Sequence, residues 1–138
     1  MREILFRGKR VDNGEWACGY FEKYNGRTYI NLQTERLNSG GYPIRDFIEV
    51  IPETVGQYTG LTDRNGKKVF EGDIIKTKEF GKDSGNGVNF NNFDIFEVIY
   101  SSASFKLNNS RRLFNMIRGQ KFEVIGNIHD DPELLEVE

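Results

Sequence analysis

Hydrophobic side chains recur at every second position in short runs along this chain, and turn residues separate the runs. Alternation of this kind is typical of β-strands, because successive strand residues point to opposite faces of a sheet. The pattern therefore predicts a mainly β protein made of small antiparallel sheets. The expected strands are residues 4–6, 16–21, 28–32, 47–51, 69–70, 73–77, 93–100 and 122–128.

The turns between these strands carry their own sequence signals. Asn13-Gly14, Asn25-Gly26 and Asn65-Gly66 favour the positive φ angles of tight turns whose twist matches that of the flanking strands. Asn25-Gly26 lies between two strand runs, so it predicts a hairpin in which Ile30 and Leu32 share one face. Longer polar segments at 34–46 and 79–92 predict loops.

Two short helices are also expected. Ser110 can cap a helix over 110–118 that places Leu113 and Ile117 on one face, with Gly119 just beyond its end. Near the C-terminus, Asp131 can cap a helical turn that begins at Pro132 and turns Leu134 and Leu135 inward.

The chain has 138 residues, the length of one ordinary domain, and 37% of them are hydrophobic. Within a single domain, 1–138, the pattern predicts two subdomains. Residues 1–58 would form an antiparallel sheet, and residues 62–138 would form a barrel-like β unit with short helices. The segment from Gly72 to Lys76 has the look of the first strand of an SH3-like barrel, a likeness of fold that does not fix function.

Composition indicates the cellular compartment of the protein but says little about its activity. The N-terminus lacks the apolar run of a signal peptide, and no stretch is long and apolar enough to span a membrane. The single cysteine, Cys18, cannot form an internal disulfide, which fits a reducing cytoplasm. Because Cys18 lies in an alternating run, we expect it to be a small core residue.

Reactive groups are scarce. The chain has one histidine, His129, so the pattern predicts no catalytic residue, no metal site and no cofactor. One alternative is that His129, Asp130, Asp131 and Glu133 hold a hard cation for a metal-assisted hydrolase. The simpler interpretation is that Asp131 caps the C-terminal turn. Asp63-x-Asn65-Gly66 lacks the spacing of a calcium loop and predicts only a turn.

Basic residues are concentrated in the segments 64–82 and 106–121, although the net charge is −2. Clustered Lys and Arg can neutralise phosphates even on an acidic protein, whereas an ordinary solvated surface is the alternative interpretation. The candidate nucleic-acid contacts are Arg111, Arg112, Arg118, Lys76, Lys78 and Lys82.

Three segments are more specific than the general sequence pattern of β-strands and turns. They are the opening MREILFRGKRVDNGEWACGYF, the central VIPETVGQYTGLTDRNGKKVFEGDIIK and the ending FEVIGNIHDDPELLE. In this order and spacing the chain resembles the YopX family, small proteins encoded by phages and prophages. The resemblance implies a predominantly β fold, a bacterial cytoplasmic location and an accessory role, and it supplies no catalytic residues.

The sequence therefore predicts a non-enzymatic phage or prophage accessory protein that acts by binding host or phage macromolecules. A nucleic-acid-binding module that uses 64–82 and 106–121 is the second hypothesis, and the hydrolase around His129 is the third. Unpaired strand edges also predict a homo-oligomer.

Overall fold

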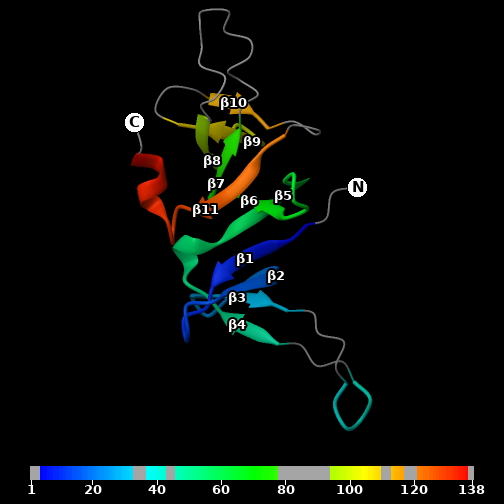
Figure 1. Ribbon diagram of the computed structural model, residues 1–138. Helices are drawn as coiled ribbons and strands as arrows, with labels where there is room; N and C mark the ends of the chain where they lie inside the picture. Colours follow the sequence, from blue (N-terminus) through cyan, green and yellow to red (C-terminus); the bar gives the residue numbers. More distant parts are fainter. Residues whose placement is uncertain are drawn as a thin grey trace, which may run out of the picture. The chain divides into compact units, whose positions relative to one another are not determined.

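The computed structural model describes residues 4–32, 37–42, 46–77, 94–109, 113–116 and 121–136 (Figure 1). Strands dominate it, which confirms the mainly β prediction. The strands are β1 (Phe6–Lys9), β2 (Trp16–Tyr24), β3 (Arg27–Asn31), β4 (Phe47–Glu49), β5 (Gly56–Thr62), β6 (Lys68–Phe70), β7 (Asp73–Thr77), β8 (Asp94–Ser101), β9 (Ser104–Asn108), β10 (Leu113–Asn115) and β11 (Glu123–Asn127). The 3-10 helices are η1 (Pro52–Thr54) and η3 (Pro132–Glu136).

The chain divides into two compact units, Met1–Tyr58 and Thr59–Glu138. In the first unit the strands are ordered β4-β3-β2-β1, and the start of β5 pairs with β1. The predicted hairpin is confirmed, because β2 and β3 pair in antiparallel register up to Tyr24 opposite Arg27. Asn25 and Gly26 both have positive φ, 50° and 75°, as the turn requires.

One face of the first sheet holds the core of its unit. Ala17, Ile30 and Val50 are buried there, and partly buried hydrophobic residues pack against them. Glycines let the strands approach this core closely. A Cβ on Gly19 would overlap the carbonyl oxygen of Asn31, and a Cβ on Gly8 would lie 2.9 Å from the Cβ of Val50.

The second unit contains a five-stranded antiparallel sheet in the order β10-β9-β8-β7-β11, and the end of β5 lies beside β6. As its apolar sequence indicates, β8 is central in that sheet. Its core is formed by Val69, Ile75, Phe96, Val98, Leu107 and Phe122. The sheet is open in the residues that are described, so the barrel-type part of the prediction is not confirmed.

The helix predicted over 110–118 is wrong where it can be compared. Leu113–Asn115 is the strand β10, which pairs with β9. The Phe114 ring reaches the core and meets Phe96 edge-on at 6.0 Å between centroids, whereas Leu113 is exposed. Burial of one residue in two favours a strand here over the helical spacing of Leu113 and Ile117.

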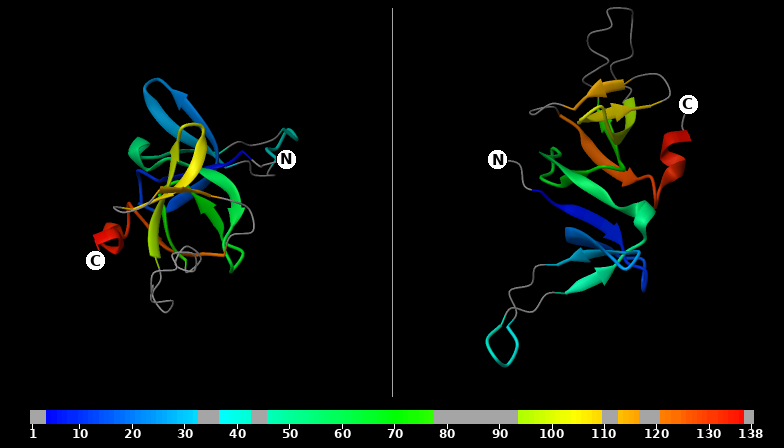
Figure 2. Two further views of the ribbon diagram at one scale, coloured as in Figure 1. Left: turned by 90° about the horizontal axis from the view of Figure 1, so that it is seen from above. Right: turned by 180° about the vertical axis from the view of Figure 1, so that it is seen from behind.

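The predicted C-terminal turn is present as η3, which follows β11 closely (Figure 2). Leu134 and Leu135 are half-buried, as expected. The Asp131 carboxylate accepts a hydrogen bond from the Asn127 backbone N–H at 3.3 Å, and its carbonyl accepts one from the Leu134 N–H. The side chain of Asp131 thus secures the turn that precedes the helix.

The prediction that Cys18 is a core residue is wrong. Cys18 is exposed, while its neighbours Ala17 and Gly19 are buried. The two faces of β2 both carry apolar residues, so alternation alone did not decide which face is inward. Packing decides it, because Ala17 joins the buried cluster of Ile30 and Val50, and this places Cys18 on the other face of the strand.

Candidate functional site

The face of the first sheet that points away from the core is rich in aromatic rings. Residues opposite one another in antiparallel strands share a face, and the register pairs Glu22 with Tyr29 and Asn31 with both Tyr20 and Phe47. The exposed side of β2 therefore continues across β3 and β4. The aromatic residues on it are Trp16, Tyr20, Tyr24, Tyr29 and Phe47.

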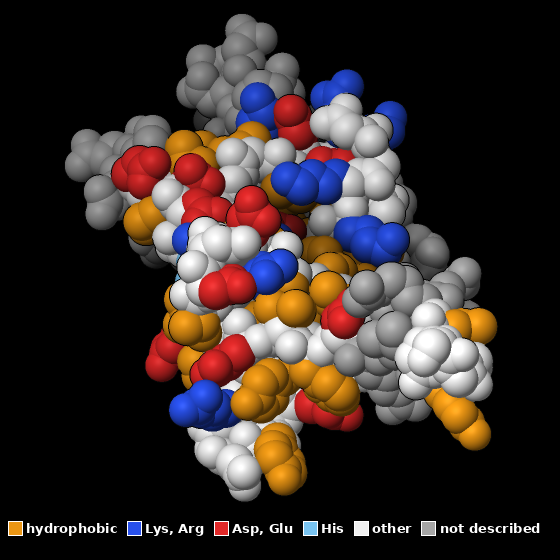
Figure 3. Space-filling view, turned by 90° about the horizontal axis from the view of Figure 1, so that it is seen from below, with side chains coloured by type: hydrophobic (Ala, Val, Ile, Leu, Met, Phe, Trp, Pro, Cys, Tyr) orange, Lys and Arg blue, Asp and Glu red, His pale blue; other side chains and the backbone are white. Residues whose placement is uncertain are grey.

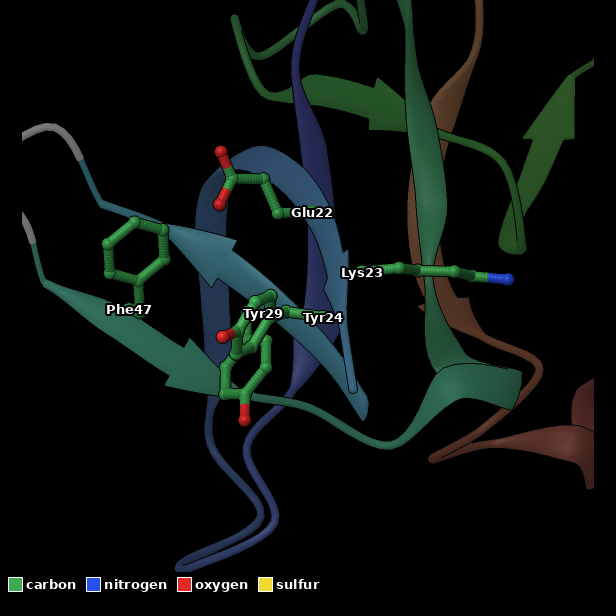
Figure 4. Close-up of a pocket in the computed structure, with 5 residues that line it drawn as sticks. All are labelled: Glu22, Lys23, Tyr24, Tyr29 and Phe47. Carbon is green, nitrogen blue, oxygen red and sulfur yellow. The ribbon is translucent and has the colours of Figure 1, made fainter. Parts of the chain in front are cut away.

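A groove of about 540 Å³ opens on this face, and its lining comes from Glu22, Lys23, Tyr24, Tyr29 and Phe47 (Figure 4). Tyr24 and Phe47 are 69% and 47% exposed, so their rings are available to a ligand. The rings of Tyr29 and Phe47 lie 6.5 Å apart at 87°, which forms a corner of two aromatic walls. We call these five residues the aromatic groove.

The charges around the aromatic groove favour a positive ligand. Glu22 places a carboxylate in the lining, whereas the Lys23 side chain extends away from Glu22 and Phe47 (Figure 4). The Lys23 ammonium lies 6.0 Å from the centre of the Phe21 ring, on the opposite face of the strand. Beside the groove, Arg27 and Glu49 form a pair at 3.6 Å, which leaves little net charge at that point.

Cations also lie over an aromatic ring at the β1 end of the face. The guanidinium of Arg7 is 4.6 Å from the centre of the Trp16 ring, and the ammonium of Lys9 is 5.8 Å from it. This is the geometry of a cation–π contact. Seen from below, exposed hydrophobic side chains lie among acidic and basic ones (Figure 3).

Of the predicted nucleic-acid contacts, only Lys76 lies among the described residues. Lys76 lies on β7, where its ammonium is 3.7 Å from the carboxylate of Glu123, opposite it on β11. The remaining candidates, Arg111, Arg112, Arg118, Lys78 and Lys82, lie outside the described residues, as does the predicted loop 79–92.

Another group of cations gathers in the second unit. Arg64, Lys67 and Lys68 are exposed in and beside the turn between β5 and β6, and the exposed Lys121 precedes β11. The Arg64 backbone N–H donates to the carbonyl of Phe122 at 3.0 Å, which brings these two basic segments side by side. We call Arg64, Lys67, Lys68 and Lys121 the basic cluster.

Asp63 builds the turn that carries the basic cluster. One carboxylate oxygen accepts from the N–H groups of Asn65 and Lys67, both at 2.9 Å, and the other accepts from the Val124 N–H at 3.0 Å. Burial alone would raise the pKa of Asp63, but these hydrogen bonds and the charge of Lys67 lower it below its usual value. The prediction of a turn is confirmed.

The pKa of the Glu97 carboxyl is shifted in the opposite direction to that of Asp63. Its pKa is raised, first by burial in the second sheet and then by the nearby negative charge of Glu71.

Around His129 the backbone forms a compact turn. The Asn127 amide oxygen accepts from the N–H groups of His129 and Asp130, at 3.0 and 2.9 Å. In the described part of the chain, no group of three or more His, Cys, Asp or Glu side chains is arranged to hold a metal ion.

Sequence reasoning missed the aromatic groove. The signal was present in the alternation of Tyr20, Glu22 and Tyr24, which places two tyrosines and a carboxylate on one side of β2. Phe47 could not be assigned to that side, because the register between β3 and β4 follows a long connection rather than a tight turn.

Comparison with known protein families gives one decisive match. The model of the YopX protein family matches residues 5–136. This chain belongs to the YopX family. A search of curated proteins returned no match for this YopX-family chain.

Among solved structures, this YopX-family chain is similar to the crystal structure of protein EF1440 from Enterococcus faecalis. The two are 21% identical, the match covers 98% of this chain and 99% of that one, and the TM-score is 0.54. The likeness shows a shared fold. Within the described residues, no helix has the length and apolar character needed to cross a membrane.

Proposed function

We propose that this YopX-family protein is a non-enzymatic accessory protein that binds another macromolecule through the outward face of its first sheet. The exposed aromatic groove of Tyr24, Tyr29 and Phe47 carries the proposal. Aromatic residues are enriched where proteins contact partners, because each ring offers a large rigid surface at a small entropic cost. These rings lie outside the buried cluster of Ala17, Ile30 and Val50, and the rings of Tyr24 and Phe47 are exposed, so a partner can reach them.

The setting of the proposal follows from the sequence. The likeness to phage and prophage proteins, together with a single cysteine, supports action in the cytoplasm of a bacterial host. The partner would accordingly be a host or phage protein.

Site-specific photo-crosslinking tests whether this face binds. Benzoylphenylalanine would be incorporated in living cells in place of Tyr24 or of Phe47. In the control protein it would replace Val11, an exposed residue of the same unit. We expect a discrete adduct from the first two positions that Val11 does not give, and protease or nuclease treatment identifies its class. No adduct, or the same adducts from all three positions, would refute the proposal.

Nucleic-acid binding is a second candidate function, and the basic cluster favours it. Four exposed cations from segments far apart in sequence lie on one part of the second unit. A gel shift of single-stranded DNA should weaken as salt is raised, because phosphate contacts release counterions. Replacing Arg64, Lys67 and Lys121 together with Gln should abolish the shift, and so should replacing Arg111, Arg112 and Arg118. A shift that is insensitive to salt would exclude this candidate.

We also propose that the protein forms homo-oligomers. In the described part of the chain, β4 and β10 lie at the edges of their sheets, and the unpaired backbone groups of an edge strand can pair with a further strand. Light scattering that finds only the mass of one chain at working concentration would exclude self-association.

A further inference from the structure

The aromatic groove combines two features, aromatic walls and a carboxylate, that together define a ligand chemistry. Its walls are the rings of Tyr24, Tyr29 and Phe47, drawn from three adjacent strands, and its polar group is the carboxylate of Glu22 (Figure 4). The face of an aromatic ring carries negative charge density that attracts a cation, and a nearby carboxylate adds to that attraction. Aromatic rings with a carboxylate therefore suit an ammonium or guanidinium group.

We propose that the aromatic groove binds a Lys or Arg side chain in a basic segment of a partner protein. This inference rests on the proposed function, since it names the chemistry of the partner at the same surface. The corner between Tyr29 and Phe47 presents two rings at 87° to one group, and Tyr24 supplies a third surface.

The local charges select a cation over an anion. Lys23 places its ammonium on the other face of the sheet, near Phe21, and so does not neutralise Glu22. Arg27 is engaged by Glu49, so the pair contributes no net charge beside the groove. A nucleic-acid strand would bring a phosphate close to Glu22, which is unfavourable.

The size of the groove fits part of a peptide. Its volume of about 540 Å³ falls in the roughly 300–1,000 Å³ range of ligand pockets. It therefore has room for a basic side chain with some of the residues around it. Guanidinium groups stack on aromatic rings in addition to their cation–π attraction, so Arg is expected to bind more tightly than Lys.

Peptide binding measured by fluorescence anisotropy tests the inference. The probe is a short labelled peptide that alternates alanine with arginine, and its control replaces arginine with citrulline, which has the same shape without the charge. We expect the citrulline peptide to bind at least about tenfold more weakly at low salt. The arginine peptide should also bind more tightly than the corresponding lysine peptide.

Groove variants assign the binding to these residues. Tyr24→Leu and Phe47→Leu keep an apolar side chain but remove the ring, and each should weaken binding of the arginine peptide about 3- to 10-fold. Glu22→Gln should weaken it by a similar factor. The matched controls are Tyr42→Leu, a tyrosine that is 70% exposed against 69% for Tyr24, and Glu53→Gln, an exposed glutamate of the same unit. Both controls should stay within about twofold of the natural protein.

Three results would overturn the inference, and the first two come from the peptide measurements. One is equal binding of the citrulline and arginine peptides, and the other is equal loss in the controls and the groove variants. A single-stranded oligonucleotide whose binding is lost in Tyr24→Leu would overturn it as well. If crosslinks from Tyr24 still capture a macromolecule in any of these cases, the proposed binding face stands and only its cationic ligand is excluded.

Discussion

Asp63 is a buried carboxylate whose charge is stabilised by the backbone. Its exposed fraction is 7%, and its two oxygens accept three main-chain hydrogen bonds that join the β5–β6 turn to β11. Hydrogen bonds to an ionised acceptor are stronger than those between neutral groups. The residue therefore stabilises the second unit more strongly when it is ionised than when it is protonated.

We expect Asp63→Ala to lower the free energy of unfolding at pH 7 by about 2–3 kcal/mol, because the Val124 N–H loses its acceptor within the fold. The pKa of Asp63 is lower in the folded state than the value of about 3.9 in the unfolded chain. Its ionic stabilisation is therefore complete above that value and is lost as the pH falls through the folded pKa.

Urea unfolding of the natural protein and of Asp63→Asn, at a series of pH values, measures this contribution. The difference between the two should shrink on acidification below about pH 4. The exposed Glu53→Gln serves as the control and should cost little at pH 7. A difference that grows as the pH falls would contradict the assigned role.

At the scale of elements, local sequence signals predicted the β2–β3 hairpin but missed or misassigned three other strands. Asn25-Gly26 specifies its own turn, so the β2–β3 hairpin followed directly. No strand was predicted over Gly56–Thr62 or Ser104–Asn108, although both are paired. In Gly56–Thr62, glycine and polar residues break the alternation, and the pairing with β1 depends on a strand far away in sequence. Ser104–Asn108 does alternate, with Phe105 and Leu107 buried, so this signal of a strand was missed. β10 was mistaken for a helix because the four-residue spacing of Leu113 and Ile117 was given more weight than pairing with β9.

The close approach of β2 and β3 at Gly19 gives a testable prediction. Gly19→Ala would place a methyl group against the carbonyl oxygen of Asn31, so β2 and β3 must shift. We expect a loss of about 1–3 kcal/mol in the free energy of unfolding. Cys18→Ala, at the neighbouring exposed position, should change it by less than about 0.5 kcal/mol. If chemical denaturation shows the same free energy of unfolding for both variants, the close contact at Gly19 does not determine the stability of the hairpin.

At the scale of the whole molecule, the two units have separate hydrophobic clusters. The first centres on Ala17, Ile30 and Val50, and the second on the residues around Phe96. Composition and turn spacing predicted the β class. The aromatic groove could not be predicted from the sequence. Its prediction would require the register of β3 against β4 and the knowledge of which face of β2 is inward. The basic segments 64–82 and 106–121 were recognisable in sequence, but the proximity of Arg64 to Lys121 depends on the hydrogen bond between Arg64 and Phe122.

The separate clusters predict two unfolding transitions. Trp16 is the only tryptophan and lies in the first unit, so its fluorescence follows that unit, whereas far-ultraviolet circular dichroism follows both. In urea titrations, Asp63→Ala should lower the midpoint seen by circular dichroism and leave the Trp16 midpoint nearly unchanged. Gly19→Ala should shift the Trp16 midpoint. If each variant moves both midpoints equally, the chain unfolds as a single cooperative unit.

The outward position of Cys18 has a practical consequence. The natural chain contains one thiol, and that thiol stands on the same side of β2 as Tyr20 and Tyr24, a short distance along the strand from the aromatic groove. A fluorophore or spin label can therefore be attached there without engineering a new site or removing competing cysteines. Such a reporter would register the arrival of any molecule on this surface, whatever its chemical class, before its identity is known.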